Sequence, residues 1–267
     1  MNFDFSYLDI AFKNGSVITV NAQDEIAQAV GVKGNKIVFV GSNEDIDQLI
    51  DEKTQVIDLK GRTLMPGLND SHYHPILNGM IGTELDSAMV DTGFARAKDI
   101  PALLAILKAV TDTKAPGKWV SSMGFEATLL KEQRYPTLEE LDAIAPNNPL
   151  QALTCNGHNA IYNSKALEYL KVYTAEDAKK YPEGEVVVAD GKLTGEVRGH
   201  THFWLWGQVE YTEPQQRKAA MKSQKQCLEL GITSVGDMGE CDAPSYHIMQ
   251  KMCRDGDFKI RSYMALH

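Results

Sequence analysis

The chain has 267 residues, of which 43% are hydrophobic and 24% charged, a composition typical of a globular protein with one large domain or two ordinary ones. Its formal net charge of −9 argues against a nucleic-acid partner, because surfaces that bind nucleic acid are usually basic. No apolar run is long enough to cross a bilayer, and the N-terminal residues lack the basic and apolar segments of a signal peptide.

Residues 1–60 predict short strands joined by tight turns. Lys13-Asn14-Gly15 and Lys33-Gly34-Asn35 are hairpin signals between apolar and β-branched runs. Ser42 is a suitable cap for a short helix over residues 43–50. The expected strands cover residues 7–12, 16–20, 29–32, 36–41 and 56–59. We therefore expect a β-rich layer that is separate from the rest of the chain.

Residues 61–75, G-R-T-L-M-P-G-L-N-D-S-H-Y-H-P, carry the strongest chemical signal. A short apolar run and a Pro-Gly break predict a strand that enters a core with His72 and His74 at its C-terminal end. Because residues i and i+2 of a strand face the same side, the two imidazoles are expected to converge on one point. Paired neutral imidazoles are good zinc ligands, and Asp70 on the same face could orient a ligating histidine or a water molecule. The alternative for a bare H-x-H pair is two unrelated surface histidines.

After residue 66 the pattern changes to longer helices and strands. Helices are expected over residues 100–110 (apolar all round and therefore buried), 137–142, 213–230 and 244–253, and strands over residues 119–125, 149–154, 232–237 and 258–266. The ends of these strands carry Glu126, His158 and Asp237, which are our candidates for lining a substrate site. For His158, a buried histidine with satisfied hydrogen bonds is the competing interpretation.

A second H-x-H pair, His200 and His202, precedes F-W-L-W and does not end a buried strand, so we do not expect it to bind metal. Glu196 follows a turn and either faces the site or is a solvated hairpin carboxylate. These three residues are the reserve ligands if the first pair proves insufficient.

Several sequence motifs resemble those of the amidohydrolase superfamily. P-G-L-x-D-x-H-x-H-P over residues 66–75 is similar to its first barrel strand, where the paired histidines bind the catalytic metal. G-F-E at 124–126, G-H-N-A-I-Y-N-S-K-A-L at 157–167 and G-I-T-S-V-x-D at 231–237 are similar to the branch that contains the N-substituted formamide deformylases. The resemblance implies an α/β fold with a small β-sandwich portion over residues 1–65. Residues 66–267 would then be the first part of a (β/α)8 TIM-like barrel, with an insertion at about residues 80–200.

The resemblance also implies the chemistry. His72 and His74 would bind one or two divalent ions, with zinc the first choice, for hydrolysis of a C–N bond in an amide-like, formamide or cyclic-amide small molecule. The remaining ligands and the general base would lie beyond His267, so the barrel would be incomplete here and would need a C-terminal half or a second chain. A homo-oligomer is possible.

Two other functions stay open. The chain could be a catalytically silent fragment or interaction subunit, or it could belong to a deaminase of an aminated ring, which uses the same metal chemistry. Cys155, Cys227, Cys241 and Cys253 form no C-x-x-C pair, which is typical of reduced thiols, so we expect a cytoplasmic protein.

Overall fold

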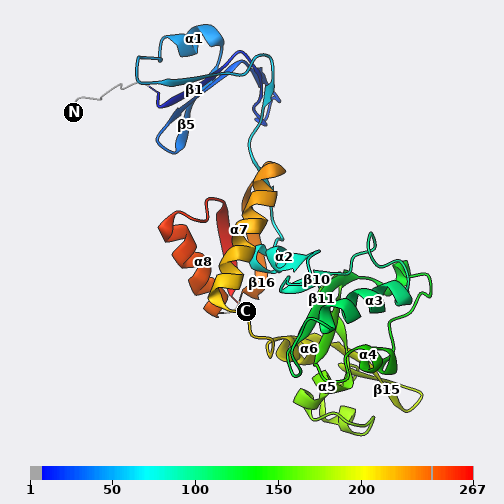
Figure 1. Ribbon diagram of the computed structural model, residues 1–267. Coiled ribbons are helices and arrows are strands. Elements are labelled where there is room, and N and C mark those ends of the chain that lie inside the picture. Colours follow the sequence, from blue (N-terminus) through cyan, green and yellow to red (C-terminus); the bar gives the residue numbers. More distant parts are fainter. Residues whose placement is uncertain (1–7, 242, 267) are drawn as a thin grey trace. The chain divides into compact units, whose positions relative to one another are not determined.

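The computed structural model describes residues 8–241 and 243–266 (Figure 1). The chain divides into two compact units, one formed by residues 1–69 with 231–233 and the other by residues 70–230 with 234–267. This division falls a few residues after the boundary expected at residues 65 and 66. Within the described residues, no helix combines the length and the apolar character needed to cross a membrane.

The first unit is built from short strands and one short helix. Its strands are β1 (Ile10–Lys13), β2 (Ser16–Ile18), β3 (Ile26–Ala27), β4 (Ala29–Lys33), β5 (Lys36–Gly41), β6 (Gln55–Asp58) and β7 (Thr63–Leu64). They form two sheets with the orders β5-β4-β1-β6 and β3-β2-β7. The helix α1 (Asn43–Asp47) begins at Ser42, whose hydroxyl accepts a hydrogen bond from the Asp45 N–H, and its Ile46 packs into a small core with Ala11 and Ala29. The β-rich region expected from the hairpin signals is therefore observed in the part of residues 1–60 that is described.

The second unit is dominated by a seven-stranded sheet with the order β14-β15-β13-β12-β11-β10-β9. These strands are β9 (Ile81–Gly82), β10 (Met89–Asp91), β11 (Val120–Phe125), β12 (Leu150–Thr154), β13 (Asn159–Tyr162), β14 (Val186–Ala189) and β15 (Lys192–Arg198). The pairs from β9 to β12 are parallel, and those from β12 to β14 are antiparallel. The sheet therefore changes direction at β12, within the segment expected as an insertion.

Helices α3 (Ile100–Thr111) and α4 (Leu138–Ile144) pack on this sheet through a shared apolar core. Leu103 and Leu107 of α3 are fully buried, whereas Ala105 and Lys108 are exposed. The expectation that α3 is buried on all sides was therefore wrong: its small and charged residues form a solvent-facing side. The remaining helical elements near the sheet are η1 (Ala127–Leu129), α5 (Ser164–Leu167), η2 (Glu168–Leu170), η3 (Asp177–Lys180) and α6 (Gly199–Trp206).

A third group of elements carries the paired histidines. The strands β8 (Leu68–Asp70), β16 (Ile232–Cys241) and β17 (Arg261–Leu266) form a sheet with the order β17-β16-β8. Strands β16 and β17 are parallel and are connected through α8 (Ala243–Asp255). Helix α2 (Pro75–Met80) packs closely against α7 (Glu213–Glu229), because Gly79 lets the backbone of α2 approach the Ala219 carbonyl. The protein is thus a mixed α/β protein.

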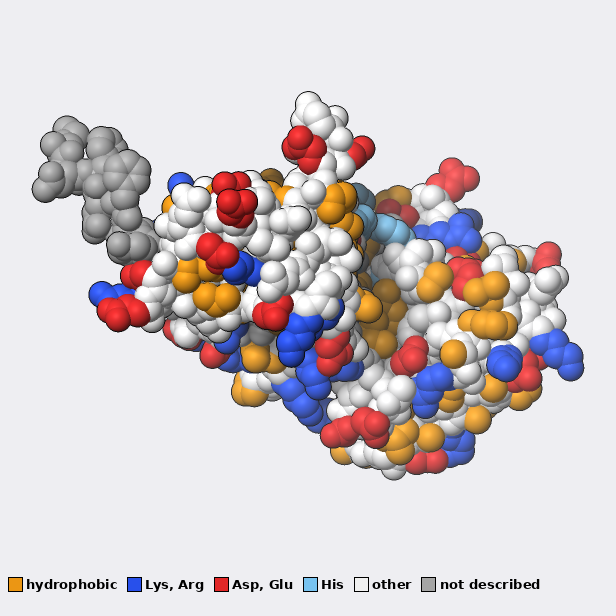
Figure 2. All heavy atoms as spheres, turned by 90° about the horizontal axis from the view of Figure 1, so that it is seen from above, with side chains coloured by type: hydrophobic (Ala, Val, Ile, Leu, Met, Phe, Trp, Pro, Cys, Tyr) orange, Lys and Arg blue, Asp and Glu red, His pale blue; other side chains and the backbone are white. Residues whose placement is uncertain are grey.

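Charged side chains of both signs are interspersed over the face drawn in Figure 2, with apolar side chains between them. This distribution matches the modest acidic excess of the sequence.

Candidate functional site

His72 and His74 lie just after strand β8, in the bend that leads into α2. The expectation that both lie on the strand itself was therefore wrong. The strand ends because the Asp70 carboxylate accepts a hydrogen bond from the His72 N–H, 3.1 Å, a local turn that draws the backbone out of the extended conformation. His74 then precedes Pro75, whose fixed φ starts the helix. The two imidazoles nevertheless lie side by side, with ring centroids 5.1 Å apart and perpendicular planes.

Asp237 on β16 holds the His74 ring. Its carboxylate Oδ1 lies 2.9 Å from His74 Nδ1, and only 4% of Asp237 is exposed. Because an ionised carboxylate can only accept, Nδ1 carries the proton, and this leaves Nε2 as the nitrogen with a ligand lone pair. Such a carboxylate–histidine pair fixes the orientation and the tautomer of a metal-binding imidazole.

The backbone next to Asp237 is shaped for this contact. The Tyr73 N–H donates to the Gly236 carbonyl, 2.8 Å, which aligns the histidine bend with β16. A Cβ on Gly236 would lie 2.9 Å from the Ser71 carbonyl oxygen, so this close approach requires glycine. Tyr73 points toward α7, where its hydroxyl lies 2.9 Å from the Ser223 hydroxyl, and burial raises its pKa to about 12.

The structure gives each of the two carboxylates a contact with the histidine segment. Asp70 was expected to orient a ligating histidine or a water molecule, and its carboxylate accepts a hydrogen bond from the His72 N–H. Asp237 was expected to line a substrate site, and its carboxylate contacts the His74 imidazole. The signal that could have identified this pairing is the Gly236-Asp237 pair within a strand that runs beside the histidine bend.

The donor set fits part of a zinc site. Two adjacent imidazoles, one of them oriented by a buried carboxylate, are the ligand type that zinc prefers. A complete site needs three or four protein ligands, and no group of three or more His, Cys, Asp or Glu side chains able to hold a metal occurs among the described residues. His267, at the chain end, lies outside them.

Glu126 and His158 make their contacts in the other part of the second unit, at the ends of β11 and β12. The Cys155 thiol lies 3.8 Å from the Glu126 carboxylate, and the exposed His158 ring packs edge-on against Phe203 with centroids 5.9 Å apart. The structure therefore places Asp237 against His74, whereas Glu126 contacts Cys155 and His158 contacts Phe203.

The reserve residues have partners away from the first histidine pair. Glu196 is buried and ion-paired with Arg198, whose Nε lies 2.7 Å from Oε1. His202 lies on α6, fully buried, with Nδ1 2.8 Å from the Tyr162 hydroxyl and Nε2 3.1 Å from the Gly157 carbonyl. Burial lowers the pKa of His202 to about 4. His200 is exposed, and on a helix residues i and i+2 diverge, so the two rings of this pair do not face one site.

Comparison with known proteins gives three findings. The sequence pattern of the Amidohydrolase family matches residues 55–263. The N-substituted formamide deformylase of Arthrobacter pascens is 29% identical over 240 residues, which are 86% of this chain and 42% of the relative. The 5-methylthioadenosine/S-adenosylhomocysteine deaminase of Acetivibrio thermocellus is 40% identical over 253 residues, 85% of this chain and 56% of the relative.

Among solved structures, a metal-dependent hydrolase from Pyrococcus horikoshii superimposes with a TM-score of 0.67 at 23% identity, covering 96% of this chain and 48% of that one. This likeness concerns the fold alone. The chain spans about half the length of the proteins it matches.

Proposed function

Because the chain belongs to the amidohydrolase family, we propose that it forms part of a metal-dependent hydrolase that cleaves a C–N bond of an amide-like, formamide or cyclic-amide small molecule. The observation that carries this proposal is the pair of perpendicular imidazoles, His72 and His74, 5.1 Å apart, with the His74 ring held by the buried Asp237. The similarity to a formamide deformylase supports the substrate class.

In this proposal each residue has a defined task. His72 and His74 supply two nitrogen ligands for one or two divalent ions, with zinc the first choice. Asp237 is a positioning residue that keeps the proton on His74 Nδ1 and presents Nε2. A divalent cation bound there would polarise the substrate carbonyl and acidify a water molecule. Asp70 stabilises the bend that places His72.

The remaining ligands and the general base come, in this proposal, from a C-terminal continuation or from a second chain. His72 and His74 are two protein ligands, and a catalytic zinc site requires three. Strands β8, β16 and β17 would then be the first strands of a (β/α)8 barrel, with the seven-stranded sheet as its insertion. The free thiols of Cys155, Cys227 and Cys253 support a cytoplasmic location.

Deamination of an aminated ring is the second candidate, favoured by the 40% identity to a deaminase. Both reactions replace a C–N bond with a C–O bond at a carbon activated in the same way, so the same histidine pair serves either. They differ in the released product, which is ammonia for the deaminase and a carboxylate with an amine for the amide hydrolase.

The first test is zinc binding by the 267-residue chain, measured by equilibrium dialysis. We expect weak binding that is lost in His72→Ala and in His74→Ala and retained in His200→Ala, the matched control at an exposed histidine. Equal zinc content in all four proteins would overturn the assignment of the site.

The second test is turnover by the protein completed with its C-terminal part or partner chain. The substrates are an N-alkylformamide, an N-acyl amine, a cyclic imide and an aminopurine nucleoside, with formate, carboxylate and ammonia measured separately. Release of formate or carboxylate supports the amide hydrolase, and release of ammonia supports the deaminase. No turnover of any substrate by the zinc-loaded complete protein would support the catalytically silent alternative.

A further inference from the structure

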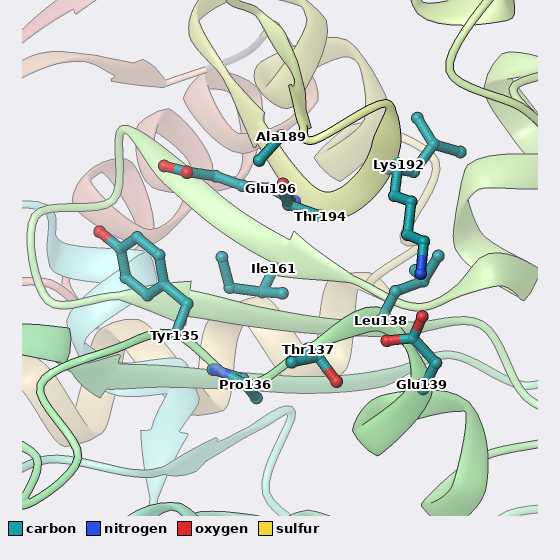
Figure 3. Close-up of a pocket in the computed structure, with 11 residues that line it drawn as sticks. Tyr135, Pro136, Thr137, Leu138, Glu139, Ile161, Ala189, Lys192, Thr194 and Glu196 are labelled. Atoms are coloured by element: carbon teal, nitrogen blue, oxygen red, sulfur yellow. Dashed lines mark hydrogen bonds between the residues drawn. The ribbon is translucent and has the colours of Figure 1, made fainter.

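A pocket of about 430 Å³ lies in the second unit, between the start of α4 and the β14–β15 hairpin. Its walls are residues 135–139, Ile161 of β13 and both strands of the hairpin (Figure 3). This volume is within the range of about 300–1,000 Å³ that is common for small-molecule sites. None of the residues assigned to the histidine site lines it.

Both walls are held in place by local hydrogen bonds. On the α4 side, Thr137 and Glu140 form a reciprocal capping box, and Arg134 binds the Glu140 carboxylate through two nitrogens, each 2.8 Å from an oxygen. On the other side, Ala189 and Lys192 are paired across a tight turn in which Asp190 and Gly191 have φ values of 49° and 72°. Two positive φ values are typical of a type I′ turn, which fixes the hairpin end rigidly. The pocket is therefore preformed.

One end of the pocket carries two opposite charges that are not used by the fold. In Figure 3 the Lys192 side chain extends toward the side of the pocket that holds the Glu139 carboxylate. Both residues are exposed, and within residues 8–241 and 243–266 neither charged group has an ion-pair or hydrogen-bond partner. The third charge in the lining, Glu196, is already neutralised by Arg198.

The rest of the pocket is apolar and ends at a hydroxyl. Ile161 and Pro136 are buried, and Leu138 and Leu193 are half-buried, so they offer a surface for an apolar group. Tyr135 closes the opposite end, where Figure 3 shows its hydroxyl on the same side as the Glu196 carboxylate. Its hydroxyl oxygen accepts from Asn159 Nδ2, 3.3 Å, and burial raises its pKa, so the O–H proton stays in place at neutral pH.

We propose that this pocket binds a free α-amino acid with an apolar or aromatic side chain. The carboxylate of the ligand pairs with the Lys192 ammonium and its ammonium pairs with the Glu139 carboxylate, while its side chain packs between Ile161 and Pro136. A zwitterionic head group fits because it neutralises both charges at once. A simple anion or cation would leave one of them unpaired.

The test is calorimetric titration of the 267-residue chain with three compounds: L-phenylalanine, N-acetyl-L-phenylalanine, which lacks the ammonium, and phenethylamine, which lacks the carboxylate. We expect saturable binding of phenylalanine and at least ~10-fold weaker binding of each analogue. Lys192→Gln should weaken phenylalanine binding ~10-fold. It should leave phenethylamine binding unchanged, because phenethylamine lacks the carboxylate with which the Lys192 ammonium pairs. Glu139→Gln should likewise weaken phenylalanine binding ~10-fold and leave N-acetyl-L-phenylalanine binding unchanged, because this analogue lacks the ammonium with which Glu139 pairs.

Lys131→Gln and Glu183→Gln are the matched controls, since both residues are exposed and lie outside the pocket. Circular dichroism of every variant verifies the fold. The proposal is overturned if phenylalanine does not bind, if both analogues bind as well as phenylalanine, or if the controls lose as much affinity as the pocket variants. None of these results depends on zinc or on hydrolysis.

Discussion

At the scale of single residues, the contact between Asp237 and His74 determines how one ligand of the proposed zinc site is oriented. Replacing Asp237 by Asn keeps the shape of the side chain but removes its charge, so the His74 Nδ1–H loses a strong acceptor. We expect zinc affinity to fall about 10-fold, the lower end of the range for such outer partners. The measurement is competition with a zinc-binding dye, with Asp86→Asn at an exposed position as the control. Unchanged affinity in Asp237→Asn would show that the carboxylate does not orient the ring.

The buried His202 gives a prediction about pH. Its pKa is lowered to about 4 in the folded chain, from 6.5, chiefly because burial disfavours the charged ring. Between these two values the unfolded chain binds a proton that the folded chain does not, so stability decreases as the pH falls from 6.5 to about 4. The full effect corresponds to roughly 3 kcal/mol.

His202→Gln removes this titration and retains groups that can bond to Tyr162 and to the Gly157 carbonyl. We expect a smaller loss of stability between pH 7 and pH 5 in the variant than in the parent, measured by urea unfolding at each pH. Parallel pH dependences in the two proteins would contradict the buried neutral state of His202.

At the residue level, the sequence indicated that His72 and His74 are neighbours but not the backbone conformation that brings them together. The pair was expected on a strand, and its rings lie side by side in the bend that follows the end of the strand at Asp70. The bonding of Asp70 and Asp237 could not be predicted, because it depends on which strand lies beside the bend. The hydrogen-bond partners of the His202 ring likewise come from other segments, Tyr162 from β13 and Gly157 from the turn before it.

At the scale of elements, the packing of α2 on α7 depends on a glycine, Gly79, at the point where the two helices touch. A Cβ at Gly79 would collide with the Ala219 carbonyl, so Gly79→Ala must push the two helices apart. We expect a loss of about 2 kcal/mol or more in the free energy of unfolding. Gly207→Ala is the control, because Gly207 has a helical φ of −61° and its nearest contact would be 3.3 Å away. Denaturant unfolding of both variants is the measurement, and equal stabilities would contradict the close packing.

Element types were predictable where periodicity and caps agree. The helices expected over residues 137–142 and 213–230 and the two hairpin turns of residues 13–15 and 33–35 all lie close to the observed elements. The pairing order of the seven-stranded sheet was not predictable, because strands far apart in sequence, such as β13 and β15, are joined only through tertiary contacts. The expectation of an insertion at about residues 80–200 rested on the family resemblance.

At the scale of the whole molecule, the edge strand β5 leaves apolar side chains in solvent. Val38 and Val40, on one face of this strand, are 56% and 47% exposed. An exposed apolar edge strand promotes pairing with another chain. We expect concentration-dependent self-association of the 267-residue chain, reduced in Val38→Thr/Val40→Thr and unchanged in Leu230→Thr, which alters an exposed leucine elsewhere. Sedimentation velocity over a range of concentrations is the measurement, and a monomer at every concentration would refute the expectation.

The change of direction at β12 in the seven-stranded sheet has a kinetic consequence. The antiparallel pairs β12–β13 and β14–β15 are closed by short turns at residues 155–158 and 190–191, so each closure costs little chain entropy. The parallel pairs β10–β11 and β11–β12 can form only after a whole helix, α3 or α4, has been accommodated between their strands. During refolding we therefore expect amide protection to appear first in the two hairpins and later in β10 and β11, as pulse-labelled hydrogen exchange would record. The reverse order would mean that docking of α3 begins the folding of this sheet, and the hairpins would then be its last additions.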